Sequence, residues 1–321
     1  MHLSIIIVSW NTRDLLAQCL ESIVSNLTTD DRSLPEGTVH CPKGLSTEIF
    51  IVDNASSDDS AAMVRARFPK VRLIENRENV GFARANNQAI RASTGQYVLL
   101  LNPDTVVLPN ALREMLRYMN EHPTIGLLGG NLMNVDRTPQ VCYGNLPGLA
   151  SELLTLFGLD RRLPLPERLR SATIRASEPR AESSPVGWVL GACMLIRRTA
   201  LEQIGLLDEG YFMFSEETDW AWRAWQTGWK VEYLSTAGIL HYGGSSTRQV
   251  PNRMLPYLYA SKARFLTKHR GNLAGMCFRL AALLVVLNKG AWANLERFVS
   301  GKNNQPSQHW LNIAHRVWTL R

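Results

Sequence analysis

The sequence predicts an α/β fold in which helices pack on a parallel sheet. Four short runs of β-branched and bulky apolar residues occur within the first 104 positions, and stretches suited to helices separate them. Short connections between these segments favour parallel strands joined by crossover helices. The chain has 321 residues, 45% of them hydrophobic, so it is long enough for further strands and a C-terminal helical extension.

The first two strands are predicted at residues 3–10 and 48–52. A helix after the first strand runs to about residue 25, and the polar residues 28–46, rich in Pro and Gly, form a loop inserted before the second strand. The second strand ends in Asp53-Asn-Ala-Ser-Ser-Asp58, whose short polar side chains can bind a base or ribose and also cap the next helix.

The third strand, residues 71–75, leads into another polar loop. Gly81 permits a tight turn there, and Asn86 and Asn87 lie about one turn into the following helix. No glycine-rich loop of the dinucleotide-binding type follows the first strand, and no P-loop sequence occurs in the chain. Both of those nucleotide-binding folds are therefore disfavoured.

The fourth strand, residues 97–101, is apolar enough to be buried on both faces. Asn102 and Pro103 force a turn after it, so Asp104 lies just beyond the carboxyl end of the strand, where open α/β sheets bind ligands. A carboxylate there can hold a hard divalent cation, which would in turn hold the phosphates of a nucleotide. Taken alone, the segment is equally consistent with Asp104 capping the turn before a helix near Pro109.

Beyond Asp104, a helix is predicted at about residues 110–122 and a strand at about 125–133. Residues 161–185 are rich in Arg, Pro and Ser. One interpretation is a mobile loop that acts as a lid or contacts the acceptor, and the other is a solvated linker. The strand predicted at 187–196 contains Gly191, which would let a ligand or another backbone approach closely.

Three carboxylates gather in the first turn of a Trp-rich helix, for which Ser215 is the expected N-cap: Glu216, Glu217 and Asp219. One interpretation is structural, because acidic residues favour a helix N-terminus and Asp219 can pair with Arg223 four residues later. The other is catalytic, because apolar neighbours and like charges raise the proton affinity of a carboxylate and suit it to act as a general base.

A single histidine, His241, precedes a glycine pair after the last predicted strand, residues 230–234. It is interpreted either as a metal or phosphate ligand or as a structural histidine.

Composition limits the class of protein. Five cysteines without a CxxC pair suggest neither a disulfide framework nor a zinc site, so a reducing compartment is expected. The N-terminal apolar run lacks a basic leader, so no signal peptide is expected. The formal charge of +7 and a pI near 9.3 imply attraction to nucleic acid, anionic lipid or phosphorylated substrates.

The region from Tyr257 to Trp318 mixes basic and aromatic residues. Its longest apolar run, residues 280–287, is shorter than the roughly 20 residues expected of a membrane-spanning helix. Amphipathic helices of this composition either lie in the lipid headgroup region of a membrane or pack on the sheet as ordinary helices.

Five motifs in this order resemble the family 2 inverting glycosyltransferases, and within them the rhamnosyltransferase-like branch. They are Ile-Ile-Ile-Val-Ser-Trp-Asn (5–11), Ile-Val-Asp-Asn-Ala-Ser-Ser-Asp (51–58), Glu-Asn-Val-Gly-Phe-Ala-Arg-Ala-Asn-Asn (78–87), Leu-Leu-Asn-Pro-Asp (100–104) and Glu-Glu-Thr-Asp-Trp (216–220). The resemblance implies a GT-A-like domain with a Rossmann-like, mostly parallel mixed sheet. We expect it at residues 1–250, with a nucleotide-binding half (1–133) and an acceptor half (134–250), before a helical extension at 251–321 that associates with a membrane.

The resemblance also implies roles for single residues. Asp104 and His241 match the family's ligands for Mg²⁺ or Mn²⁺, and Asn102 stands where many relatives have a first Asp. Asp219 matches the catalytic base, and Glu217 competes with it for that role. The residues expected to bind the nucleotide sugar are Ser9, Asn11, Asp53, Asn54, Asn79, Gly81, Phe82, Asn86, Asn102, Asp104 and Gly191.

The activity implied is inverting transfer from deoxythymidine-diphosphate rhamnose (dTDP-rhamnose) or a uridine-diphosphate (UDP) sugar to a lipid-linked or polysaccharide acceptor. We expect the protein at the cytoplasmic face of a membrane, in peripheral contact with it. One alternative, a sugar-1-phosphate nucleotidyltransferase, would need a glycine-rich basic loop where residues 9–13 have no glycine. A non-catalytic glycan-binding module is the other alternative. Nucleic-acid binding would explain the charge but not the acidic loops.

Overall fold

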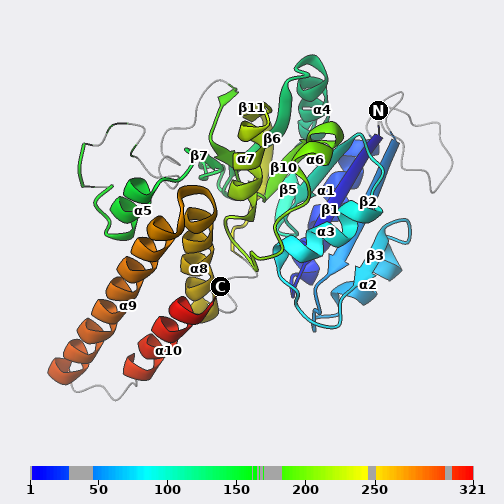
Figure 1. Ribbon diagram of the computed structural model, residues 1–321. Helices are drawn as coiled ribbons and strands as arrows, with labels where there is room; N and C mark the ends of the chain where they lie inside the picture. The colour runs from blue at the N-terminus through cyan, green and yellow to red at the C-terminus, as the bar shows by residue number, and fades with distance from the viewer. Residues whose placement is uncertain are drawn as a thin grey trace. The chain divides into compact units, whose positions relative to one another are not determined.

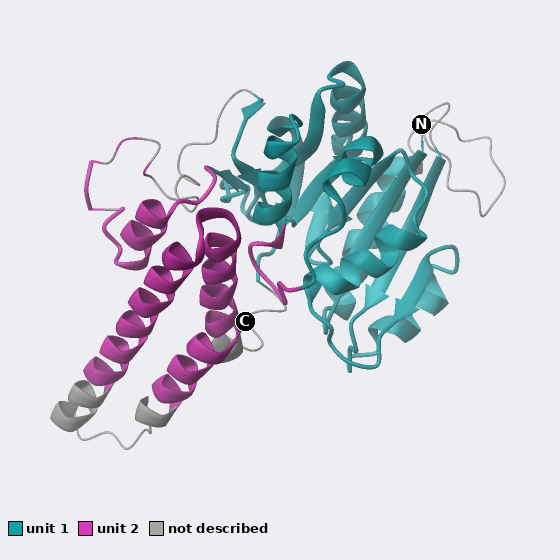
Figure 2. Ribbon diagram, viewed as in Figure 1, with its two compact units in different colours: residues 1–144, 175–209, 217–246 teal, residues 145–174, 210–216, 247–321 magenta. Residues whose placement is uncertain are grey.

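The computed structural model describes residues 2–28, 46–160, 183–244, 251–300 and 306–320, together with several positions between 162 and 169. Residues 29–45 of the predicted loop insertion at 28–46 and most of the predicted 161–185 segment lie outside the described residues. The chain divides into two compact units (Figure 2). Unit 1 contains residues 1–144, 175–209 and 217–246, and unit 2 contains residues 145–174, 210–216 and 247–321.

Unit 1 is built on a mixed sheet, as the resemblance implied. The strand order is β3-β2-β1-β4-β10-β6-β11-β5, with β8 (Ser184–Pro185) paired to β11. The bounds are β1 His2–Ser9, β2 Ser46–Asp53, β3 Arg72–Glu75, β4 Tyr97–Leu101, β5 Thr105–Val107, β6 Ile125–Met133, β10 Cys193–Arg197 and β11 Lys230–His241. The strands β3, β2, β1 and β4 run parallel, whereas β10 is antiparallel to both β4 and β6.

The central strands of the sheet are its most deeply buried part. All five residues of β4 are buried, which confirms the prediction of a strand covered on both faces. In β1, the run of Leu3, Ile5, Ile6 and Ile7 has no exposed surface. The carboxyl ends of β1, β2 and β4 therefore hold the loops that follow them on a rigid base.

Helices flank the sheet (Figure 1): α1 (Arg13–Thr28), α2 (Ser60–Arg67), α3 (Phe82–Ala92), α4 (Ala111–Glu121), α6 (Arg198–Ile204) and α7 (Glu216–Gln226). Helix α4 shows why they form. Its buried residues Leu112, Met115, Leu116 and Met119 recur every three or four positions, so they lie on the one face that packs against β6 and β11.

Two strands differ from the sequence-based expectation. The segment predicted as one strand at 187–196 contains β9 (Trp188–Val189), which pairs with β7 (Tyr143–Gly144), and then β10. The last strand, predicted at 230–234, continues to His241 because its register against β6 shifts between Leu234 and Gly238 and then resumes. His241 is consequently the last residue of a strand and not part of a loop.

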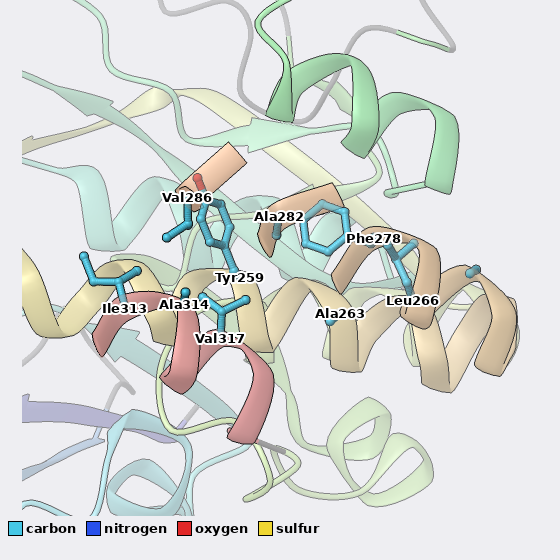
Figure 3. Close-up of a cluster of buried hydrophobic side chains, with 10 residues drawn as sticks. Tyr259, Ala263, Leu266, Phe278, Ala282, Val286, Ile313, Ala314 and Val317 are labelled. Atoms are coloured by element: carbon cyan, nitrogen blue, oxygen red, sulfur yellow. The ribbon is translucent and has the colours of Figure 1, made fainter. Parts of the chain in front are cut away.

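Unit 2 contains α5 (Leu149–Leu156), α8 (Pro251–Arg270), α9 (Asn272–Ser300) and α10 (Pro306–Thr319). Figure 3 shows its core, in which buried side chains of α8, α9 and α10 meet: Tyr259, Ala263, Leu266, Ala274, Phe278, Ala282, Val286, Ile313, Ala314 and Val317. Gly290 lets α9 and α10 approach, since a Cβ there would lie 2.9 Å from Trp310 Cβ.

One helix within the described residues, covering Asn272–Ala293 of α9, is long and apolar enough to cross a membrane, and a third of that window is buried. This helix is longer than the uninterrupted apolar run 280–287 because it includes single basic residues such as Arg279.

Candidate functional site

The loops after β1 and β2 are joined by hydrogen bonds. Asn54 N donates to the Ser9 carbonyl at 2.8 Å, and Asn11 N donates to Ser56 Oγ at 3.0 Å. Asn11 has a left-handed backbone (φ 51°), and its side-chain oxygen accepts a hydrogen bond of 2.7 Å from Ser57 N. Two strand ends that are neighbours in the sheet thus form one polar surface.

Asp53, the last residue of β2, is nearly buried, with 5% of its surface exposed. One carboxylate oxygen accepts a 3.1 Å hydrogen bond from Ser56 N, whereas the other, Oδ1, is buried and has no hydrogen-bond partner among the described residues. An unsatisfied buried acceptor is uncommon in a folded protein, and a ligand that donates a hydrogen bond would satisfy it.

The amides predicted to bind the donor also brace the loop before α3. Asn54 donates to Asn79 Oδ1 at 2.8 Å, and Asn79 Oδ1 accepts from Gly81 N at 3.0 Å. Gly81 has φ 85°, a conformation that few other residues tolerate. Asn86, on α3, donates to the Phe82 carbonyl at 2.9 Å. These contacts fix the loop, and donor binding by the same residues stays a prediction.

Asp104 and His241 come together although 137 positions separate them. Asp104 Oδ1 lies 3.3 Å from His241 Nε2, and both side chains are buried. The antiparallel pairing of β5 with β11 produces this meeting, because it places His241 opposite Thr105. Asn102 Nδ2 lies 3.4 Å from the same ring nitrogen.

Gln140 orients the imidazole of His241. Its Nε2 donates to the His241 carbonyl at 2.6 Å and to Asn134 Oδ1 at 2.6 Å, so its Oε1 is the atom that faces His241 Nδ1 at 2.9 Å. The proton of a neutral imidazole is therefore on Nδ1, and Nε2 presents a lone pair on the side of Asp104.

The two groups fit a divalent cation. When the imidazole is protonated, His241 Nε2 and Asp104 Oδ1 form an ion pair at 3.3 Å, and when it is neutral both atoms are common metal ligands that face the same space. Among the described residues, no group of three or more His, Cys, Asp and Glu side chains is placed to hold a metal ion. Such a pair would leave further coordination positions to phosphate and water, as Mg²⁺ prefers.

The two candidate bases on α7 lie in different surroundings. Asp219 is completely buried and accepts a 2.9 Å hydrogen bond from Arg223 Nε. The same guanidinium donates to the carbonyls of Ile204 and Leu206, so it ties α7 to the end of α6. The structural interpretation of the Asp219 and Arg223 spacing therefore describes a real ion pair.

Glu217 lies instead beside residues expected at the donor site. A methyl group in place of the Gly191 hydrogen would lie 3.5 Å from the Phe82 ring and 3.9 Å from Glu217 Cβ. Next to Gly191, the Ala192 carbonyl accepts a 2.9 Å hydrogen bond from Asn102 N. The segment 191–192 thus adjoins the Asn102 turn, Phe82 and Glu217, and the atoms nearest to a Cβ at Gly191 belong to the side chains of Phe82 and Glu217 and not to another backbone.

Sequence reasoning missed Gln140. This residue lies outside all five motifs, and no local pattern marks it, because its partner His241 is about a hundred positions away. The anchoring of Arg223 at the carbonyls of Ile204 and Leu206 was also missed, because a contact between a side chain and the backbone of another element leaves no local pattern.

Known proteins resemble the chain in sequence. The model of Glycosyl transferase family 2 matches residues 4–205. An N-acetylglucosaminyl-diphospho-decaprenol L-rhamnosyltransferase of Mycobacterium tuberculosis is 29% identical over 238 residues, which cover 70% of this chain and 76% of that protein. Rhamnosyltransferase WbbL of Escherichia coli is 22% identical over 202 residues, which cover 59% of this chain and 71% of that protein.

Solved structures share its fold. TarS 1-349 of S. aureus matches with a TM-score of 0.53 at 13% identity, covering 99% of this chain and 80% of that chain. Mannosyltransferase PcManGT of Pyrobaculum calidifontis, in complex with GDP-Man and Mn²⁺, matches with a TM-score of 0.52 at 14% identity, covering 98% and 84%. The family model spans more than half of the chain and the fold is GT-A, so the chain belongs to glycosyl transferase family 2 and is a glycosyltransferase.

Proposed function

We propose that the protein is an inverting glycosyltransferase that moves a sugar, most readily rhamnose, from a nucleoside-diphosphate sugar to a hydroxyl of a lipid-linked or cell-envelope glycan. The observation that carries the proposal is the buried pair of Asp104 and His241, which lies at the carboxyl ends of the sheet strands, as Asp53 does. Two of the relatives are named rhamnosyltransferases, one of them with a decaprenol-linked compound in its name. Both alternatives, the nucleotidyltransferase and the glycan-binding module, are disfavoured by the family.

We assign the binding of the donor's nucleobase to Asp53. Its unsatisfied Oδ1 needs a hydrogen-bond donor, and the imide N–H of uracil or thymine is one. The amino group of cytosine and the N1–H of guanine donate as well, so UDP-sugars and dTDP-sugars are proposed as donors because the resemblance implies them, with Asp53 as the residue that binds the nucleobase.

Asp104 and His241 would hold Mg²⁺ or Mn²⁺, and Mn²⁺ is present in the PcManGT complex. The bound cation would offset the negative charge that the diphosphate gathers as the glycosidic bond breaks. Gln140 supports the site by accepting a hydrogen bond from His241 Nδ1, which orients the ring with Nε2 toward Asp104, and Asn102 contributes an amide in place of a second carboxylate.

Of the two candidates for general base, the surroundings favour Glu217. The base must accept the proton of an acceptor hydroxyl whose pKa is far above 7, so its carboxylate must reach that hydroxyl. Both carboxylates are buried, Asp219 completely and Glu217 with 8% exposed, but that of Asp219 is bound by Arg223. Glu217 adjoins Gly191 and Phe82, near the Asn102 turn. A single displacement with a base on the side opposite the leaving group would invert the anomeric centre.

The experiment is a donor screen with acceptor glycans, run with and without Mg²⁺ or Mn²⁺ on the intact protein, Asp104→Asn and Asp53→Asn. We expect metal-dependent release of UDP or deoxythymidine diphosphate from one donor, with loss of turnover in Asp104→Asn and weaker donor binding in Asp53→Asn. Equal turnover of the intact protein and Asp104→Asn would refute the cation site. Turnover of a cytidine donor in preference to both others would refute the proposed donors, and unchanged donor binding in Asp53→Asn would refute the assignment of Asp53.

The same relatives support the proposed acceptor and location. A decaprenol-linked acceptor would be reached at a membrane, so we place the enzyme at the inner face of the cytoplasmic membrane as a peripheral protein.

A further inference from the structure

Helix α9 presents a stripe of apolar side chains to solvent. Spacings of three and four residues place its members on one face of the helix. The apolar stripe consists of Leu273 (77% exposed), Met276 (48%), Leu280 (50%), Leu284 (61%) and Leu287 (43%). A continuous exposed row of this kind usually marks a surface that meets another apolar phase.

The other face of α9 is already occupied. Phe278, Ala282 and Val286 are buried in the core that α9 shares with α8 and α10 (Figure 3). Helix α8 also carries Lys262, which forms a 2.5 Å ion pair with the buried Glu152 of α5. A pose in which α9 crossed a bilayer would take this charged neighbourhood into hydrocarbon, at high cost in free energy. A pose parallel to the membrane surface leaves it in water.

The charge of the region selects the partner. Residues 251–321 contain 11 of the 35 Lys and Arg residues but only one of the 28 Asp and Glu residues, which gives +10 for this region and −3 for residues 1–250. Lys268 and Arg270 are exposed and directly precede the apolar stripe. Pairing two copies through the stripe would bring two strongly positive surfaces together, whereas anionic lipid headgroups complement this charge.

We propose that α9 lies flat in the headgroup region of an anionic bilayer, with the apolar stripe toward the acyl chains and the basic residues of unit 2 among the phosphates. Trp292 and Trp318, exposed by 62% and 48%, add side chains that favour this interface. The inference deepens the proposed peripheral location. It requires no sugar donor, so it can be tested without turnover.

The test is co-flotation of the full chain with vesicles of phosphatidylcholine containing phosphatidylglycerol at roughly one lipid in three, against phosphatidylcholine alone. We expect at least tenfold stronger partition to the anionic vesicles. Leu280→Ser combined with Leu284→Ser should weaken that partition at least tenfold, because both side chains would enter the acyl boundary. These side chains are exposed, so thermal unfolding should be nearly unchanged.

Val135→Ser is the matched control, since Val135 is 55% exposed and lies in unit 1. It should float like the unmodified protein. Partition of the double variant equal to that of the unmodified chain would overturn the role of the stripe. Retention after an alkaline carbonate wash would overturn the flat pose in favour of a span. A dimer in lipid-free solution that the double variant dissociates would assign the stripe to a second copy instead. Each outcome is independent of whether any sugar is transferred.

Discussion

Glu217 and Asp219 stand two positions apart on α7 but differ in what their carboxylates contact. We expect Glu217→Gln to lower kcat by about 10² to 10⁴, the usual contribution of a general base, with donor affinity and thermal stability nearly unchanged. Steady-state kinetics, donor titration and thermal unfolding measure the three quantities. A variant with kcat near that of the unmodified enzyme would exclude Glu217 as the base.

Asp219→Asn should act on the fold. It removes the charge that faces Arg223 in a fully buried position, and breaking such a pair costs about 3 to 5 kcal/mol of unfolding free energy. Chemical denaturation of the purified variant gives this number. Unchanged stability with loss of turnover would instead return Asp219 to the role of base.

The proposed cation site can also be tested at Gln140, which is not itself a proposed ligand. Gln140→Met removes the acceptor for His241 Nδ1, and losses of this kind typically weaken metal binding about 10- to 100-fold. Gln140→Glu keeps the acceptor oxygen but loses the amide that donates to the His241 carbonyl and to Asn134 Oδ1, so it should restore the affinity only in part. Mn²⁺ titration by calorimetry compares the three proteins, and identical affinities would contradict the proposed role.

At this scale the sequence predicted the acidic groups and the pair of Asp219 with Arg223, but not the residue that orients His241. Asp53 and Asp104 follow apolar runs and are visible as strand ends, so local pattern was enough to find them. Gln140 was invisible because its role depends on a hydrogen bond across about a hundred positions.

At the scale of elements, the segment before α7 is held by α8, and both belong to unit 2. Arg264 lies over the Tyr211 ring at 5.3 Å, Tyr257 stacks on Phe212 at 4.5 Å, and Ser261 Oγ donates to the Met213 carbonyl at 2.8 Å. The segment ends with two left-handed residues, Phe214 (φ 72°) and Ser215 (φ 66°), a conformation that persists only where the surroundings enforce it.

Ser261→Ala should therefore loosen residues 210–215 locally. Loss of the hydrogen bond costs about 1 kcal/mol and should speed amide hydrogen exchange in that segment. Ser93→Ala is the matched control, since Ser93 Oγ makes a 2.8 Å bond to the Ile90 carbonyl in unit 1 and its loss should leave exchange at 210–215 unchanged. Equal exchange in both variants would show that α8 does not hold the segment.

Most elements of unit 1 were predictable, because apolar runs and helical periodicity set the alternation of strands and helices. The predictions failed for strands whose existence or length depends on the strand with which they pair. The three-residue strand β5 is too short to show a pattern, and it exists because β11 pairs with it. The length of β11 likewise depends on resumed pairing with β6 after an irregularity.

At the scale of the whole molecule, several carboxylates have lowered pKa values, so stability should depend on acid. Hydrogen bonds from Asn87 and Arg91 lower the pKa of Glu209 to about 2 from an ordinary value of 4.5. Burial raises the pKa of Glu48, but hydrogen bonds from Thr94 and Ser4 more than reverse this effect. Such groups bind fewer protons in the folded state, so their stabilisation is present above about pH 4.5 and is lost as pH falls toward 2.

Glu209→Gln should flatten this dependence. Thermal midpoints measured from pH 6 to about pH 3 should fall less steeply in the variant than in the unmodified chain, while the variant is less stable at neutral pH. Parallel curves for the two proteins would contradict the assignment of Glu209 to this acid sensitivity.

The position of β10 in the sheet bears on how the chain is made. The strands β1 to β4 are complete once residue 101 has left the ribosome, yet the second partner of β4 is β10, which ends at residue 197. Synthesis of the nearly one hundred residues that end with β10 takes roughly five to twenty seconds. During this time β4, an apolar strand, is an unpaired edge of the nascent sheet. A polypeptide that stalls in this interval presents a template for aggregation, so we expect its yield in cells to depend on holdase chaperones and on the speed of translation through this stretch.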